Sequence, residues 1–254
     1  MYKIAILITT FLRDSLLYKT IQTIVDNYPE DCIVLIADQG YADSEKDITL
    51  DYYKSQISLE YFKIPFDSGL SYARNFLVQK ASEMSIPYCL VSADSIQFNQ
   101  TYDFTPIIQF LELDEKRGLV GFDLENSKAK WEYLIEITQK GIQLSYSDKD
   151  YFFSNLKLTK VDICRNIFLA KTKTLLNLWD EELKLAEHEM SFLEYKKKGY
   201  EVYWTDSYVF KRISGRNNEE YETYRKRFGN YQKIMKQKLG ITGWVIYPKD
   251  KKCI

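Results

Sequence analysis

The chain has 254 residues, of which 45% are apolar, and its formal net charge is −1. This length and apolar content are enough for one large α/β domain or two small ones, and the near-zero charge argues against nucleic acid as a partner. Aromatic residues are frequent, with 21 Tyr and 14 Phe. Tyrosine rings stack on sugars and their hydroxyls hydrogen-bond to them, although many surface tyrosines have no ligand at all.

The cysteines and the apolar segments of the chain indicate the cellular compartment in which the protein resides. Cys32, Cys89, Cys164 and Cys253 are widely separated and form no C-x-x-C pair, which argues against a zinc site or a disulfide framework. The apolar run at residues 4–8 is too short for the apolar part of a signal peptide and is typical of a buried strand. No segment approaches the length of a membrane span. We therefore expect reduced thiols and a cytoplasmic protein.

The first half alternates strand and helix patterns. Apolar runs predict strands over residues 4–9, 32–37, 59–64 and 88–92, the third of them nearer an edge. Helical spacing predicts one helix over residues 15–26, with Asp14 as its cap, and another that follows Gly69. Such alternation predicts a parallel sheet with helices on both faces.

The second half is richer in strands. Hairpin segments are predicted at 131–137 and 142–146, further strands at 156–162 and 201–204, a helix at 186–198, and a basic, tyrosine-rich amphipathic helix at 218–239. We find no repeat, linker or clear boundary, and we expect a single domain over residues 1–254.

Polar residues follow the predicted strands directly. Thr9 and Thr10, Asp38, and Asp94 with Ser95 all lie at carboxyl ends of strands, where parallel sheets bind ligands. Arg74 and Asn75 lie one turn into the helix after Gly69. A position near a helix N-terminus suits a phosphate or a sugar better than it suits packing.

Five stretches resemble a known family. Residues 8–13 (Ile-Thr-Thr-Phe-Leu-Arg), 36–40 (Ile-Ala-Asp-Gln-Gly), 69–75 (Gly-Leu-Ser-Tyr-Ala-Arg-Asn) and 91–95 (Val-Ser-Ala-Asp-Ser) resemble the nucleotide-sugar half of family-2-like glycosyltransferases with the GT-A fold. The stretch from Trp179 to Glu189 resembles the acceptor-side motif of that superfamily and looks closest to relatives of the β-1,4-N-acetylgalactosaminyltransferases. The similarity covers about the first 210 residues in order.

The resemblance implies an α/β fold of the GT-A (Rossmann-like) type: a mostly parallel sheet, helices on both faces and a β-rich acceptor side. Residues 1–100 would form the nucleotide-sugar half, 101–210 the acceptor and catalytic half, and 211–254 a basic C-terminal helix and tail. It implies donor contacts from Thr9, Thr10, Arg13, Asp38, Arg74, Asp94 and Ser95. Asp38 would accept from the N–H of the nucleotide base, and Arg13 and Arg74 would lie near the diphosphate. Without the resemblance, Asp38 reads as a turn residue and Asp94 as a cap.

The resemblance also implies a divalent metal, and here the sequence departs from the family. The family loop usually offers two or three acids, whereas this chain has Ala93, Asp94 and Ser95. One carboxylate and a hydroxyl are a poor start for a hard cation. Diphosphate oxygens, water and His188 would have to complete the shell around Asp94. We expect Mg²⁺ or Mn²⁺, and the alternative is that basic side chains neutralise the leaving group without a metal. The basic run available for that comprises Lys211, Arg212, Arg216, Arg225, Lys226 and Arg227.

The catalytic base is expected at the start of the helix before Gly199. The superfamily usually places an Asp just after a Glu there, and counting back puts Glu187 on the Glu and His188 on the base. The candidates are therefore Glu187, His188 and Glu189, with the carboxylates preferred. Without the resemblance, Glu187 and Glu189 could be ordinary carboxylates in the first turn of a helix, where the helix dipole favours negative charge. In the family, the pair that corresponds to Trp179 and Asp180 lies near the acceptor sugar; the plain alternative is a core plug and a cap.

The sequence thus predicts an inverting glycosyltransferase that moves a hexose or N-acetylhexosamine from a nucleoside diphosphate, UDP in the first instance, to a glycan acceptor. We expect such an enzyme to take part in the synthesis of a bacterial surface polysaccharide. The alternative is an inactive relative that binds nucleotide or glycan as a partner subunit. The basic helix at 218–239 is either a solvated face or a peripheral contact with anionic lipid at the inner face of the membrane, which would suit a lipid-linked acceptor.

Overall fold

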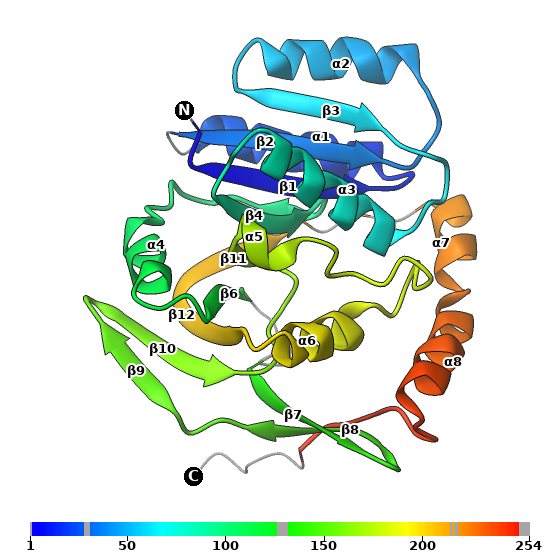
Figure 1. Ribbon diagram of the computed structural model, residues 1–254. Helices are drawn as coiled ribbons and strands as arrows, with labels where there is room; N and C mark the ends of the chain where they lie inside the picture. The colour runs from blue at the N-terminus through cyan, green and yellow to red at the C-terminus, as the bar shows by residue number, and fades with distance from the viewer. Residues whose placement is uncertain (1, 28–30, 126–131, 214, 216–217, 249–254) are drawn as a thin grey trace.

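The computed structural model describes residues 2–27, 31–125, 132–213, 215 and 218–248. Its centre is a ten-stranded sheet in the order β3-β2-β1-β4-β11-β6-β12-β10-β9, with β5 paired to β12 (Figure 1). Helices cover both faces of this sheet, so the predicted α/β class is confirmed.

The first half of the sheet is parallel. β1 (Ile4–Thr10) lies between β2 (Cys32–Asp38) and β4 (Tyr88–Ala93), and β3 (Leu59–Lys63) forms the edge beyond β2. Ile4, Ile6 and Ile8 of β1 pack on one face, while Ala5 and Leu7 pack on the other. Burial on both faces explains the continuous apolar runs that made β1, β2 and β4 predictable. β3 is only partly buried, in agreement with its predicted place nearer an edge.

The second half of the sheet is mixed. β11 (Phe168–Lys171) runs antiparallel between β4 and β6 (Arg117–Leu124), and β6 pairs in parallel with β12 (Glu201–Arg212). The remaining strands are β10 (Leu156–Val161), β9 (Asp150–Phe153) and the short β5 (Ile96–Gln97).

The sequence did not predict β5, β6, β9 or β11, and it ended β12 too early, at residue 204. In β6, Gly118 and Gly121 interrupt the apolar run that would otherwise predict a strand. A Cβ at Gly118 would meet the Tyr195 hydroxyl, and one at Gly121 would meet the Cys164 sulfur. Here a glycine marks a close approach inside a strand rather than a turn.

Three helices lie on each face of the sheet. On one face are α1 (Asp14–Asp26), α2 (Ser44–Lys54) and α4 (Thr105–Glu112); on the other are α3 (Leu70–Glu83), α5 (Thr172–Leu175) and α6 (His188–Lys197). α2 and α4 were not predicted. α2 is mostly polar and buries only Lys46, Leu50 and Tyr53, which leaves little apolar period to detect.

Two helix starts differ from the prediction. α1 begins at Asp14 itself, with Arg13 in the cap position and no side-chain cap bond; Asp14 pairs instead with Lys46 at 2.8 Å. α6 begins at His188 rather than at residue 186, because Ala186 adopts a positive φ of 61° and Glu187 takes the cap position.

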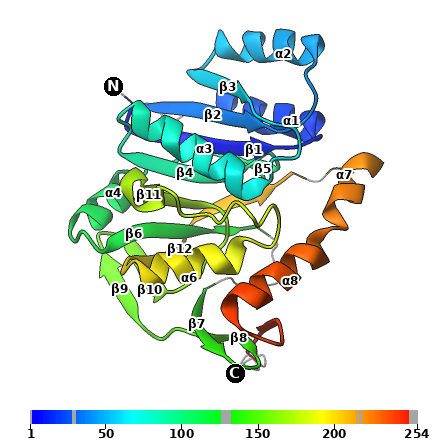
Figure 2. The same cartoon turned by 45° about the vertical axis from the view of Figure 1, so that its right-hand side comes forward.

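The predicted helix over residues 218–239 is two helices. α7 (Glu219–Arg225) starts after Asn218, whose side chain accepts from the Tyr221 N–H at 2.6 Å, and α8 (Phe228–Leu239) follows a break at residues 226–227. Together they form an arm that runs along one side of the molecule, from the parallel half of the sheet to a small second sheet (Figures 1 and 2).

The small sheet has the order β13-β8-β7. It confirms the predicted hairpin as β7 (Tyr133–Thr138) and β8 (Gly141–Tyr146), to which β13 (Val245–Ile246) adds a third strand. Of the predicted hairpin, residue 131 lies outside the described residues, and residue 132 precedes β7.

Within the described residues, no helix combines the length and hydropathy that a membrane span requires. The three cysteines described, Cys32, Cys89 and Cys164, are buried and form no disulfide with one another. Burial raises the pKa of each of these thiols, so none of them is reactive at neutral pH. Cys253 lies outside the described residues.

Candidate functional site

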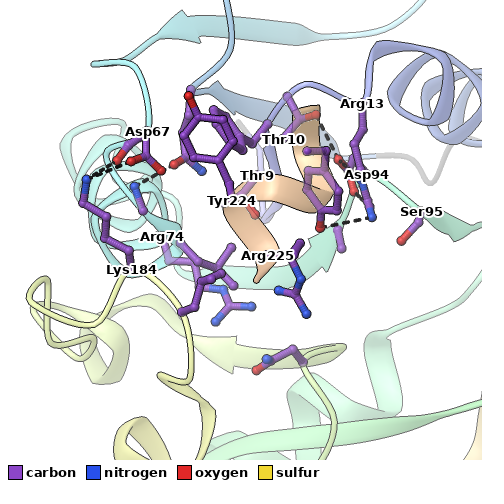
Figure 3. A pocket seen from close by; sticks show the side chains of 18 of the residues that line it. Thr9, Thr10, Arg13, Asp67, Arg74, Asp94, Ser95, Lys184, Tyr224 and Arg225 are labelled. Atoms are coloured by element: carbon purple, nitrogen blue, oxygen red, sulfur yellow. Dashed lines mark hydrogen bonds and ion pairs between the residues drawn. The ribbon is translucent and has the colours of Figure 1, made fainter. Parts of the chain in front are cut away.

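A cavity of 280 Å³ opens at the carboxyl ends of β1 and β4 (Figure 3). The loops after these strands form one wall, and the segment before α6, the end of β12 and the arm form the others. Six of the seven predicted donor-binding residues line it together: Thr9, Thr10, Arg13, Arg74, Asp94 and Ser95. Parallel topology brings them together, since each follows or faces the end of a central strand.

The lining is strongly cationic. Six basic side chains reach it from distant parts of the chain, namely Arg13, Arg74, Lys184, Arg212, Arg225 and Arg227, whereas its carboxylates among the described residues are Asp67 and Asp94. The cavity therefore suits an anionic ligand. Of the predicted basic run, Lys211 and Lys226 do not line the cavity and Arg216 lies outside the described residues.

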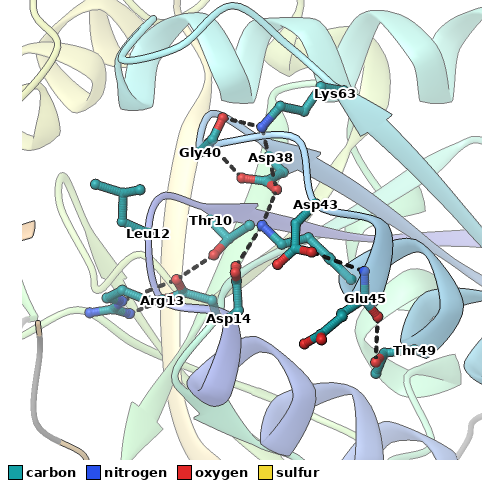
Figure 4. Close-up of polar contacts among 12 residues, drawn as sticks. Thr10, Leu12, Arg13, Asp14, Asp38, Gly40, Asp43, Glu45, Thr49 and Lys63 are labelled. Atoms are coloured by element: carbon teal, nitrogen blue, oxygen red, sulfur yellow. Dashed lines mark hydrogen bonds and ion pairs between the residues drawn. The ribbon is translucent and has the colours of Figure 1, made fainter.

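Asp94 is held by Arg13. Its Oδ2 accepts from Thr10 Oγ1 at 2.9 Å and from Arg13 Nε at 3.1 Å, and its Oδ1 pairs with the Arg13 guanidinium as well (Figures 3 and 4). Burial alone would lower the pKa of Arg13, but the hydrogen bond and charge of Asp94 outweigh burial and raise it. The bidentate pair occupies both carboxylate oxygens.

The donor set does not fit a divalent metal. Within the described residues no group of three or more His, Cys, Asp or Glu side chains comes together. Asp94 is engaged by Arg13, and His188, the other expected ligand, does not line the cavity. A hard cation needs several oxygen ligands and is repelled by the surrounding guanidinium groups. The expectation that Asp94 and His188 share a metal is therefore not supported by their positions.

Asp38 does not line the cavity. Its carboxylate is fully buried and accepts from Lys46 Nζ at 2.8 Å and Tyr61 Oη at 2.7 Å. It also accepts from the Gly40 N–H at 2.6 Å, as Figure 4 shows. Burial would raise its pKa, but these three hydrogen bonds outweigh burial and lower it. Asp38 thus anchors α2 and β3 in this structure, and its neighbour Gln39 lines the cavity instead.

The N-terminus of α3 forms hydrogen bonds with other parts of the chain rather than facing an open loop. The Gly69 N–H donates to Gln39 Oε1 at 2.7 Å, the Leu70 N–H donates to the Lys184 carbonyl at 3.0 Å, and Ser71 Oγ donates to the Leu183 carbonyl at 2.6 Å. Asn75 likewise exchanges hydrogen bonds with the backbone of Trp179. The 66–75 stretch therefore positions the segment that precedes α6, a role that the sequence did not predict.

Arg74 joins the cavity to the start of α6. It is 4% exposed, and its Nη1 donates to Glu187 Oε1 at 2.6 Å. Its guanidinium lies over the Trp179 ring at 5.5 Å, and its Nε has no hydrogen-bond partner among the described residues. This burial contradicts the expectation that Arg74 lies in an open setting, although it does line the cavity.

The three predicted catalytic residues are adjacent to the cavity but do not line it. Burial lowers the pKa of His188 to about 3, with the charges of Arg74 and Arg165 acting in the same direction. Burial raises the pKa of Glu189 to about 7. Glu187 is paired with Arg74. The pKa of Glu189 is therefore closer than that of His188 to the value that suits accepting a proton near neutral pH.

The two predicted acceptor-side residues have structural roles here. Trp179 is 3% exposed and belongs to the core cluster, so its ring offers no face for stacking on a sugar. The Asp180 side chain accepts from the Glu182 N–H at 3.1 Å and pairs with Lys238 of α8. Trp179 thus has the position of the core plug given as its alternative, whereas Asp180 precedes a turn and no helix that it could cap. Their roles near an acceptor sugar stay predictions.

The arm closes the cavity through aromatic and ionic contacts. The Phe11 ring meets Tyr224 edge-on at 5.0 Å, and Arg13 lies over the Tyr221 ring at 5.0 Å. Arg227 pairs with Asp67 at 2.8 Å, and Lys184 pairs with the same carboxylate at 3.2 Å. The sequence had assigned Arg13 to the donor site and named Arg227 in the basic run. It had not assigned Phe11, Asp67, Lys184, Tyr221 or Tyr224, and the available signal for the two tyrosines was the density of Tyr and Arg in 218–239.

A comparison with protein families shows to which family the chain belongs. The model of glycosyl transferase family 2 matches residues 5–163, which is more than half of the chain and includes β1, β4 and the Asp94 loop. The chain belongs to glycosyl transferase family 2. This glycosyltransferase therefore carries its cationic cavity where the resemblance of the sequence placed a donor site.

Solved structures with the same fold are distant in sequence. The chain matches S. aureus TarS residues 1–349 with a TM-score of 0.59 and 12% identity, covering 94% of this chain and 69% of that one. A mannosyltransferase from Pyrobaculum calidifontis in complex with GDP-Man and Mn²⁺ matches with a TM-score of 0.59 and 11% identity, over 90% and 61%. GalNAc-T7 with UDP, GalNAc and Mn²⁺ matches with a TM-score of 0.61 and 11% identity, over 85% and 44%. These likenesses confirm the GT-A fold, and two of the neighbours were solved with Mn²⁺.

Proposed function

We propose that this glycosyltransferase uses a nucleoside diphosphate sugar, UDP-linked in the first instance, as its donor. The cavity carries this proposal: six basic side chains gather in 280 Å³ at the carboxyl ends of β1 and β4. A donor of this kind places two phosphates between a base and a sugar, and guanidinium groups match phosphate oxygens in geometry and charge. A TarS structure with UDP-GlcNAc has the same fold with a TM-score of 0.62 at 11% identity.

We further propose transfer of a hexose or N-acetylhexosamine to a glycan acceptor with inversion at the anomeric carbon, in the synthesis of a bacterial surface polysaccharide. A base at the start of α6 would take the proton of the acceptor hydroxyl as the new bond forms. Arg74 supports this placement, because it contacts both the cavity and Glu187.

A donor screen tests the proposal. Calorimetry with UDP-, GDP- and CDP-sugars should reveal one preferred base, and NMR of the product anomer should show inversion. If no nucleotide sugar binds, the donor proposal is wrong; if a retained anomer forms, only the stereochemical part is wrong.

Three single variants test the base. Glu187→Gln, His188→Asn and Glu189→Gln should be assayed for transfer while donor affinity is measured alongside. The variant that removes the base should lose turnover by about 10²- to 10⁴-fold and keep its donor affinity. If all three keep their turnover, the base does not lie at the start of α6.

One observation favours the alternative function, a partner subunit that binds nucleotide without transfer. Asp94, the remaining acid of the family loop, is bound by Arg13. Donor binding without hydrolysis or transfer would support this alternative.

A peripheral contact with anionic lipid through the arm is a separate proposal. It is weakened by the position of Arg225 and Arg227, which line the cavity. Cosedimentation with vesicles that contain phosphatidylglycerol tests it.

A further inference from the structure

We propose that Arg212 and Arg225 bind the donor diphosphate directly and take the place of a divalent metal in this glycosyltransferase. The inference rests on the proposed function, since it names what holds the diphosphate of that donor. The basic residues that line the cavity differ in whether they form ion pairs with carboxylates.

Four of the six cations already have a carboxylate partner. Arg13 pairs with Asp94, and Arg74 pairs with Glu187 at 2.6 Å. Lys184 and Arg227 share Asp67. Each of these groups is neutralised at least in part before any ligand arrives.

Arg212 and Arg225 differ from the other four. Neither side chain has a hydrogen bond or ion pair with another described residue, and both line the cavity. Two unpaired guanidinium groups match the charge of a diphosphate that carries one negative charge on each phosphate.

The fold places Arg212 beside the loop in which the family expects its additional acids. Arg212 is the last residue of β12 and pairs in register with Ile96, directly after Ser95. The next N–H, that of Ile213, donates to the Ser95 carbonyl at 2.9 Å. A fixed positive charge therefore lies next to the Asp94 loop, where it disfavours a second positive charge such as Mn²⁺.

The arm contributes Arg225 to the lining of the cavity. It is the last residue of α7, one helical turn after Tyr221, so the two side chains share a helix face. Tyr221 contacts Arg13, the partner of Asp94, through its ring at 5.0 Å and its hydroxyl at 3.5 Å. Arg225 and Arg212 line the same cavity, and Figure 3 shows Arg225 among the side chains around it.

The experiment compares nucleotide affinity with and without metal. Calorimetry of UDP, GDP and CDP should be run in EDTA and again in Mn²⁺, for the unmodified chain and for Arg212→Gln and Arg225→Gln. We expect the preferred nucleotide to bind equally well in the two buffers, within about twofold, and each variant to weaken binding by about 10-fold or more, the size of a lost charge-assisted hydrogen bond.

Matched controls come from the neighbouring residues. Lys211→Gln removes a cation that pairs with Glu125 on the other side of β12, and Lys226→Gln removes one that lies just beyond α7. Both should leave nucleotide affinity unchanged, whereas Arg225→Lys should restore part of the affinity lost in Arg225→Gln.

The outcomes are distinguishable. Binding that EDTA abolishes and Mn²⁺ restores would overturn the arginine inference and leave the proposed function intact. Binding that is unaffected in both arginine variants, while the variants melt like the unmodified chain, would also overturn it. If no nucleotide binds in either buffer, both the donor proposal and this inference are wrong.

Discussion

Gly69 shows how a single residue shapes the site. It has a φ of +99°, and a Cβ there would lie 2.7 Å from Lys184 Cα. A side chain would therefore strain the backbone and push the segment before α6 away from α3. The Gly-Leu-Ser stretch before α3 lies very close to the segment before α6. This close approach explains why glycine is needed at the first position of the stretch.

We predict that Gly69→Ala destabilises the protein by about 1–3 kcal/mol, since strain and steric overlap act together. Urea unfolding monitored by circular dichroism measures this change. Gly229→Ala is the matched control: Gly229 lies inside α8 with open space around its Cβ position. That substitution should stabilise the protein by up to about 1 kcal/mol. Equal effects at the two positions would contradict the prediction.

Glu189 gives the chain a pH dependence. Burial raises its pKa from 4.5 to about 7, and no described Lys, Arg or His pairs with it. The native state therefore keeps a proton between these two values that the unfolded chain releases. It follows that the free energy of unfolding falls as pH rises through this interval and levels off above it.

We predict that the unmodified chain loses up to about 3 kcal/mol of stability between pH 5 and 8 relative to Glu189→Gln, which cannot titrate. Urea titrations of both proteins at several pH values measure the difference. Parallel stability curves for the two proteins would show that Glu189 titrates normally.

At the scale of elements, the arm is the part on which the cavity depends most. α7 and α8 bury Met235 alone of their residues, yet the arm supplies Arg225, Arg227 and three tyrosines to the lining. The Tyr224 ring meets Phe11 at 5.0 Å and Phe66 at 5.8 Å. This aromatic cluster attaches α7 to the parallel half.

We predict that Tyr224→Ala loosens α7 and weakens nucleotide binding about 10-fold, because the arm must then be ordered by the ligand. Hydrogen exchange should rise in residues 219–225 and stay unchanged in β1 and β4. Thr223→Ala, at an exposed position on the same helix, is the control. Unchanged exchange in α7 would show that other contacts hold it.

The elements also show what a sequence can reveal. Strands buried on both faces leave long apolar runs, so β1, β2 and β4 and the polar residues behind them were predictable. α2 is too polar to leave a helical pattern of apolar residues. The sequence therefore could not predict that Lys46 of α2 pairs with Asp38. The break between α7 and α8 was not predicted, although Gly229, a poor helix former, follows it closely. The arginines of the basic run were identifiable as candidates, but their place in the cavity follows from tertiary docking alone.

At the scale of the whole molecule, the cavity exists only when four distant segments meet. Asp67 links three of them, since it pairs with Lys184 before α6 and with Arg227 of the arm. Lys238 of α8 adds pairs with Asp180 and Glu182. The unfolded chain therefore has no equivalent of this cavity, and a ligand that fills it should stabilise the native state as a unit.

We predict that UDP at 100 times its Kd, in EDTA, raises the free energy of unfolding by about 2.7 kcal/mol and Tm by about 5–10 °C. Uridine at the same concentration should shift Tm much less, because it carries no phosphate for the cations that line the cavity. Differential scanning calorimetry measures both shifts. An equal shift with uridine would mean that the base and ribose carry the binding. The cationic lining would then serve some other anion.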